Sequence, residues 1–226
     1  MRKTLIKRTI LATLGLASSA VLAHTGEMAH AHGGDAMSSF FQAALHPLTG
    51  LDHLAAMVSV GLWSALTARH GRDGSSRGVS RTMWAAPAAF AATLLVGALL
   101  GLGGLKLPGV EPMIAASLLI LGLLVCTRTA LPTLAGGALV SGFALFHGLA
   151  HGAELAGTHA AAALTGMALS TAGLHALGIA IGMGLRNSRA GTRGRQGARQ
   201  WASRVAGACV AVFGAALLTP AVANAF

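Results

Sequence analysis

The sequence predicts an all-α membrane protein, a polytopic helical bundle with six transmembrane helices after a cleaved signal peptide. Hydrophobic residues make up 54% of the 226 residues and charged residues only 10%, which leaves too little polar surface to cover such a core in water. Six apolar runs each approach the ~20 residues that cross a hydrocarbon core. The runs are rich in Ala, Leu and Gly and do not alternate, so we expect helices and not barrel strands.

Residues 1–23 have the three parts of a secretory signal peptide. A basic start, MRKTLIKR, precedes an apolar stretch from Thr9 to Leu22, and small residues lead to Ala23. Cleavage after Ala23 would make His24 the first residue of the mature chain. An uncleaved signal anchor is the alternative.

Residues 24–45 are expected to form a histidine-containing arm on the periplasmic side. The stretch HTGEMAHAHGGDAMSS is polar and has no apolar period, which is typical of a flexible segment. His24, with the α-amino group that cleavage would free, could chelate a metal ion there.

A six-helix transmembrane domain follows over residues 46–226. We expect its helices at residues 46–68, 83–105, 110–130, 132–156, 160–185 and 202–224. The first turns of the first, third and fourth helices, where a missing amide hydrogen does little harm, then hold Pro47, Pro112 and Pro132. Close backbone contacts between helices are predicted by three glycine pairs with a four-residue spacing: Gly97 and Gly101, Gly148 and Gly152, and Gly178 and Gly182.

Arginine side chains gather in alternate loops and indicate the orientation. They lie between the first and second helices, after the third, and between the fifth and sixth. The loops on the opposite side hold a single Lys or Arg residue, Lys106. By the positive-inside rule the arginine loops are cytoplasmic, and the mature N-terminus and the C-terminus are periplasmic. We therefore expect a multi-pass protein of the bacterial inner membrane, with arginines that can also contact anionic membrane lipid.

Two imidazoles and a carboxylate share one stripe of the fourth helix. His147, His151 and Glu154, in the segment FHGLAHGAE, are separated by four and three residues, which places their side chains on one helix face. A charged acid near the middle of an apolar span costs about 2.5–3.5 kcal/mol on insertion scales, so such a cluster indicates function.

A second polar cluster opens the first helix, in the segment HPLTGLDH. His46 and His53 are seven residues apart and so share one face of a continuous helix, with Asp52 one step round from His53. Asp52 could bind a metal directly or hold a neighbouring imidazole in the tautomer that binds one.

Both clusters are expected at the same depth in the outer part of the membrane. His53 lies about 24 Å along its helix from the cytoplasmic Arg69, and the other cluster forms the last turns of a helix that runs outward. If the two helices are neighbours, these side chains face each other across a cavity open to the periplasm. Four to six nitrogen and oxygen ligands would suit a first-row divalent metal such as nickel, cobalt or zinc.

Two further groups could take part. Glu111, at the outer start of the third helix, could complete the ligand shell or attract cations, or it could be a solvated carboxylate favoured by the helix dipole. His175, about 16 Å from Arg186 in the fifth helix, could act as an inner relay site or simply bond to a backbone carbonyl.

At these residues the chain resembles the HupE/UreJ family of nickel permease-like membrane proteins. The family pattern H-x5-D-H matches His46, Asp52 and His53, and the pattern F-H-G-x-A-H-G-x-E matches residues 146–154. The resemblance implies a secondary permease that supplies nickel, typically to hydrogenase or urease maturation, with these His, Asp and Glu residues needed for transport. Nickel, or cobalt in similar proteins, would be the substrate. The resemblance implies no prosthetic group, and residues 46–226 would be the permease domain.

The sequence gives no sign of an ATPase or of nucleic-acid binding. It has no Walker A loop, so any transport would be channel-like or ion-coupled. The net charge of +10 comes from loop arginines without the interleaved aromatic residues of a nucleic-acid surface.

Three other interpretations stay open. In an intramembrane zinc hydrolase the same His and Asp residues would hold a catalytic zinc, with Glu154 as base and Ser141 polarising a carbonyl, although no HExxH motif occurs. A non-transporting metal receptor or assembly factor would rely on the arm. Purely structural polar networks would only join helices.

Overall fold

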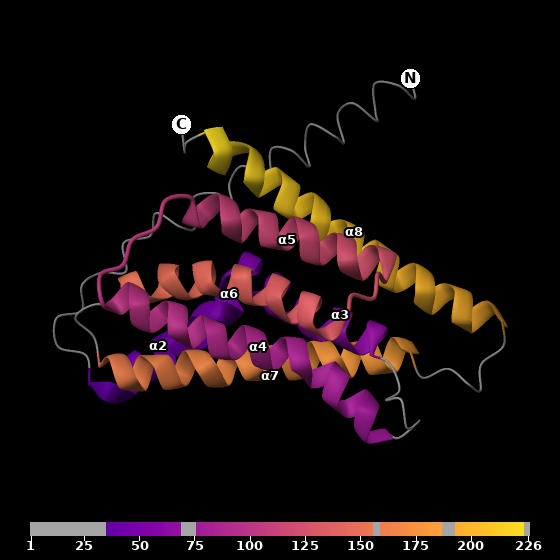
Figure 1. The fold of residues 1–226 in the computed structure, drawn as a ribbon, viewed down its shortest axis with the longest axis horizontal. Helices are drawn as coiled ribbons and strands as arrows, with labels where there is room; N and C mark the ends of the chain where they lie inside the picture. The colour runs from indigo at the N-terminus through magenta and orange to yellow at the C-terminus, as the bar shows by residue number, and fades with distance from the viewer. Residues whose placement is uncertain (1–34, 69–75, 156–158, 187–192, 224–226) are drawn as a thin grey trace. The chain divides into compact units, whose positions relative to one another are not determined.

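The computed structural model describes residues 35–68, 76–155, 159–186 and 193–223, which form an all-α bundle (Figure 1). Its helices in chain order are α2 (Ala36–Thr49), α3 (Leu51–Thr67), α4 (Ser76–Leu102), α5 (Val110–Thr127), α6 (Thr133–Glu154), α7 (Ala160–Arg186) and α8 (Arg193–Ala223). The expected signal peptide, and residues 24–34 of the expected arm with His24, lie outside the described residues.

Five of these helices are long and apolar enough to cross a membrane: α4 from Arg81, α5, α6, α7 and α8 over residues 197–220. They match the second to sixth helices that the sequence predicts. Large apolar side chains on their surfaces are exposed, among them Leu99, Leu134, Leu169 and Val212, which is the surface that lipid tails cover. The chain is therefore a polytopic helical membrane protein, and this part of the prediction is confirmed.

The first predicted helix differs, because two helices meet at Gly50 where one continuous helix was expected over residues 46–68. The segment from Ala36, the last part of the expected arm, is already helical, and Oδ1 of Asp35 caps it by accepting a hydrogen bond from the Ser38 amide at 2.8 Å. Pro47 lies in the last turn of α2 and not in a first turn. Since proline cannot donate to the preceding turn, the helix ends soon after it.

Both halves of this broken helix run along α7. The Gly166 backbone of α7 lies against the Phe40 carbonyl of α2, and the Gly178 backbone lies against the Val58 carbonyl of α3. A side chain at either glycine would collide with the carbonyl that it faces. One long helix therefore supports α2 and α3 in succession.

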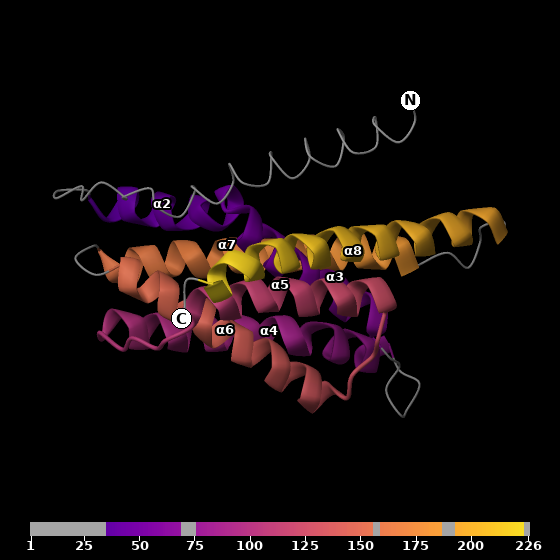
Figure 2. The same cartoon turned by 90° about the horizontal axis from the view of Figure 1, so that it is seen from above.

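The predicted glycine contacts are confirmed between α4 and α6, one of the most closely packed helix pairs. A Cβ atom at Gly148 would overlap the Leu94 carbonyl, and one at Gly152 would overlap the Ala98 carbonyl. Gly97 on α4 lies equally close to the backbone of α6. The two helices, seen together in Figure 2, therefore approach backbone to backbone over the turns that carry His147 and His151.

Arginine side chains tie the helices together at one end of the bundle, which lies to the right in Figure 1. Arg186 at the end of α7 donates to the Ala65 carbonyl of α3 at 3.1 Å. Arg128 after α5 donates to the Ser203 hydroxyl of α8 at 2.7 Å. We call this end, defined by Arg128 and Arg186, the arginine-rich end.

Candidate metal site

Three imidazoles from two distant segments meet inside the bundle. The ring centres of His46 and His53 are 5.3 Å apart, and the His151 ring lies 4.9 Å from the first and 4.6 Å from the second. One ring nitrogen of each lies within 4.8 Å of the others. Nitrogens bound tetrahedrally at about 2.0–2.1 Å lie about 3.4 Å from one another, so these atoms would have to approach by up to about 1.4 Å to share one ion. We call these three residues the imidazole cluster.

The break at Gly50 makes this cluster possible. Seven residues of continuous helix would separate His46 and His53 by about 10.5 Å along the axis, so the shared helix face that the sequence suggests does not explain their contact. The Gly50 amide instead donates to the His46 carbonyl at 3.0 Å, and the Gly50 carbonyl accepts from the Leu54 amide at 2.9 Å. The chain turns there without losing these backbone bonds, and the two rings meet across the turn.

Asp52 positions the His53 ring from the first turn of α3. One carboxylate oxygen, Oδ1, accepts from the His53 amide at 2.9 Å and lies 2.9 Å from His53 Nδ1. Because an ionised carboxylate can only accept, the proton is on Nδ1, and Nε2 keeps the lone pair that binds metal. Of the two roles open to Asp52, the geometry favours that of orienting the imidazole.

Glu154 has a similar place beside His151 in the last turn of α6. Its Oε2 lies 3.7 Å from His151 Nδ1, and its side chain is 47% exposed whereas that of His151 is 6% exposed. Nε2 of His151 is buried without a hydrogen-bond partner in the described part of the chain. The half-exposed Glu154 carboxylate therefore lies next to the buried His151 ring.

His147 adds a fourth imidazole, with its ring centre 5.3 Å from that of His53. Nε2 of this fully buried residue lies 3.0 Å from the Ser117 hydroxyl of α5. Since that hydroxyl donates to the Ile114 carbonyl at 2.6 Å, its oxygen accepts the Nε2 proton. Nδ1 then carries the lone pair and has no hydrogen-bond partner among the described residues.

The other predicted residues lie apart from the cluster. Glu111 is exposed in the first turn of α5, and no interaction within the described ranges links it to an imidazole. His175 is buried on α7, and its ring centre lies 5.2 Å from that of Phe90, which in turn lies 5.9 Å from that of His147. Phe90 thus contacts both His175 and His147.

Two site residues were not found by sequence reasoning. Ser117 is a lone hydroxyl in the middle of an apolar helix, and Phe90 is one aromatic residue among many apolar ones. Of the two, only the lone Ser117 hydroxyl gives a signal in the sequence, and that signal is weak.

Ser141, proposed for a hydrolase, is six residues before His147 and therefore about 120° away around α6.

The chain is similar to known proteins over most of its length. A family model described as HupE / UreJ protein matches residues 11–217, a range that includes every residue of the site. Protein HupE from Rhizobium leguminosarum bv. viciae is 37% identical over 211 residues, which cover 93% of this chain and 95% of that protein. No solved structure gives a significant match.

Proposed function

Because this chain belongs to the HupE/UreJ family, we propose that it is a secondary transporter that takes up a divalent transition metal across the bacterial inner membrane. Nickel is the substrate that we infer from the family, with cobalt as the nearest alternative. The metal would supply the maturation of a metalloenzyme such as hydrogenase or urease. The arginine-rich end would face the cytoplasm, because positive loops stay on that side.

The observation that carries this proposal is the convergence of His46, His53 and His151 in the interior of a membrane protein. Buried nitrogen atoms without hydrogen bonds are costly, and His147 and His151 each contribute one within the described residues. A divalent ion would satisfy these lone pairs. Imidazole nitrogens with neighbouring carboxylates are a ligand set that suits nickel, cobalt and zinc.

The break between α2 and α3 supports transport over a purely structural role. Transporter sites are commonly built where a membrane helix is discontinuous, because unwound backbone and helix ends can then face the ion. Here His46 and His53 flank the break at Gly50. The half-exposed Glu154 offers the first contact for an incoming cation, and the buried imidazoles follow behind it.

Uptake of labelled nickel, cobalt and zinc by intact cells tests the proposal. We expect His53→Ala and His151→Ala to abolish uptake while the protein remains in the membrane at normal levels. His159→Ala, at the exposed start of α7, is the matched control and should transport normally. Normal uptake in both cluster variants would refute the proposal, and the preferred ion would identify the substrate.

Two other outcomes would point to the alternative functions. A hydrolytic activity lost in Glu154→Gln, with no metal flux in wild type, would indicate a zinc hydrolase. Tight metal binding by purified wild-type protein without flux into proteoliposomes would indicate a receptor.

A further inference from the structure

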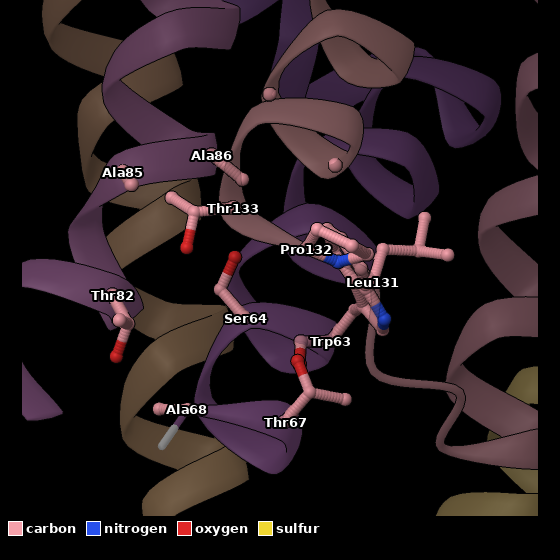
Figure 3. A pocket seen from close by; sticks show the side chains of 12 residues that line it. Trp63, Ser64, Thr67, Ala68, Thr82, Ala85, Ala86, Leu131, Pro132 and Thr133 are labelled. Atoms are coloured by element: carbon pink, nitrogen blue, oxygen red, sulfur yellow. The ribbon is translucent and has the colours of Figure 1, made fainter. Parts of the chain in front are cut away.

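A cavity of about 50 Å³ lies between α3, α4 and α6 at the arginine-rich end (Figure 3). Each helix contributes a hydroxyl to its wall: Ser64 from α3, Thr82 from α4 and Thr133 from α6. None of the 12 residues that line it in the described part of the chain is charged. A water molecule needs about 10–15 Å³ of such space, so the cavity has room for a few.

Ser64 shows that the cavity is built for a polar occupant. Its side chain points into the cavity in Figure 3, the residue is only 4% exposed, and its hydroxyl has no hydrogen-bond partner among the described residues. Buried hydroxyls are nearly always satisfied, so water or a hydrated ion is the expected partner.

The wall of the cavity is held in place by Trp63. Its indole nitrogen donates to the Thr129 carbonyl at 2.8 Å, and its ring packs against Gly136 of α6, where a Cβ atom would collide with it. The hydrogen bond and the packing therefore fix the position of Trp63, which forms part of the cavity wall.

The three helices that enclose this cavity also contact or carry the metal-site imidazoles. Along α3, Ser64 is 11 residues from His53, or about 16 Å. Fully buried apolar side chains fill the section between, including Val60, Val140 and Ala144. A short apolar section between two polar sites is an arrangement that can gate a channel by excluding water.

We propose that this cavity is the exit vestibule of the transport path, in which a divalent cation that has left the imidazole cluster regains water before it enters the cytoplasm. The inference rests on the transport function proposed above. Neutral hydroxyls suit this role because they hydrogen-bond to the hydration water of the ion but bind the ion weakly. A carboxylate in the same place would retain it.

Thiol labelling of the folded protein in membranes tests the vestibule. Ser64→Cys is made in a chain whose two native cysteines, Cys126 and Cys209, are replaced by alanine, and a small membrane-impermeant cationic thiol reagent is applied to vesicles of either orientation. We expect labelling from the cytoplasmic face only. Val60→Cys, one turn nearer the imidazoles and outside the cavity wall, is the matched control and should stay unlabelled.

Nickel flux and nickel binding are then measured on the same labelled protein. Complete labelling of Ser64→Cys should lower flux about tenfold or more by blocking the path, while nickel binding at the imidazole cluster stays unchanged. Labelling from the periplasmic face, no labelling from either face, or unchanged flux after labelling would each overturn the vestibule alone. Unlabelled protein that neither binds nor moves nickel would instead refute the transport function and the vestibule with it.

Discussion

Oδ1 of Asp52 lies 2.9 Å from Nδ1 of His53, and the same oxygen accepts the His53 backbone amide. This pairing fixes both the orientation and the tautomer of an imidazole that the break at Gly50 brings against His46. A carboxylate in this position also makes the imidazole a stronger metal ligand. The first segment therefore contributes an oriented imidazole to the imidazole cluster and a negative charge close to it.

Loss of the Asp52 carboxylate should weaken metal binding without removing a nitrogen ligand. We expect Asp52→Ala to lower nickel affinity about 10–100-fold, the usual effect of removing a group that orients a ligand. Asp52→Asn, which keeps an acceptor oxygen, should have a smaller effect. Titration calorimetry on purified protein measures both, with Ser59→Ala in the same helix as the control. Equal affinity in Asp52→Ala and wild type would contradict the orienting role.

Ser117 lies outside the two sequence motifs, but we expect it to support metal binding by orienting His147, as Asp52 orients His53. Ser117→Ala leaves the His147 Nε2 proton buried without an acceptor, which costs about 1–3 kcal/mol. We expect a lower midpoint of thermal unfolding and a several-fold loss of nickel affinity, both restored in Ser117→Thr because the hydroxyl returns. Ser141→Ala, on a different face of α6, should change neither quantity. A Ser117→Thr variant as weak as Ser117→Ala would argue against the hydroxyl contact.

Gly50 is needed because a side chain at this position would crowd its neighbours. Its backbone conformation does not require glycine. Its φ of −78° and ψ of 109° are open to any residue, but a Cβ atom there would lie 3.1 Å from both Asp52 Oδ1 and His53 Nδ1. Gly50→Ala should therefore displace this pair and lower nickel affinity up to about tenfold, with a small effect on stability.

Gly173→Ala is the control for that variant, because a Cβ atom at Gly173 meets nothing within 4 Å. Nickel affinity and the unfolding midpoint are measured for both proteins. If Gly50→Ala loses stability and keeps its nickel affinity, Gly50 is needed for the turn between α2 and α3 and not to leave room for the Asp52–His53 pair.

The sequence allows the helical bundle and the pairing of its two motifs to be predicted, because both follow from local patterns. Apolar length predicts the five long helices, and small-residue spacing predicts the contact of Gly148 and Gly152 with α4. Loop charges place HPLTGLDH and FHGLAHGAE at one depth, and their imidazoles do meet in the structure.

The broken first helix could not be predicted from these patterns. Pro47 is tolerated in the first turn of a helix, so a single helix that begins at residue 46 is the simplest interpretation of HPLTGLDH and the apolar run after it. Pro47 ends α2 locally, but the placement of the two halves depends on tertiary contacts, since α7 holds α2 through Gly166 and α3 through Gly178. Ser117 and Phe90 were missed for the same reason, because only the folded chain brings them beside His147.

The Gly152 contact with the Ala98 carbonyl should control both stability and the metal site. A Cβ atom at Gly152 overlaps that carbonyl, so Gly152→Ala must separate α4 from α6 and displace the adjacent His151. We expect a loss of about 1–3 kcal/mol in the free energy of unfolding and weaker nickel binding. Gly142→Ala in the same helix faces open space and should gain up to about 1 kcal/mol from helix propensity. Denaturant unfolding in detergent measures the two opposite signs, and a stabilised Gly152→Ala protein would show that the backbones do not meet there.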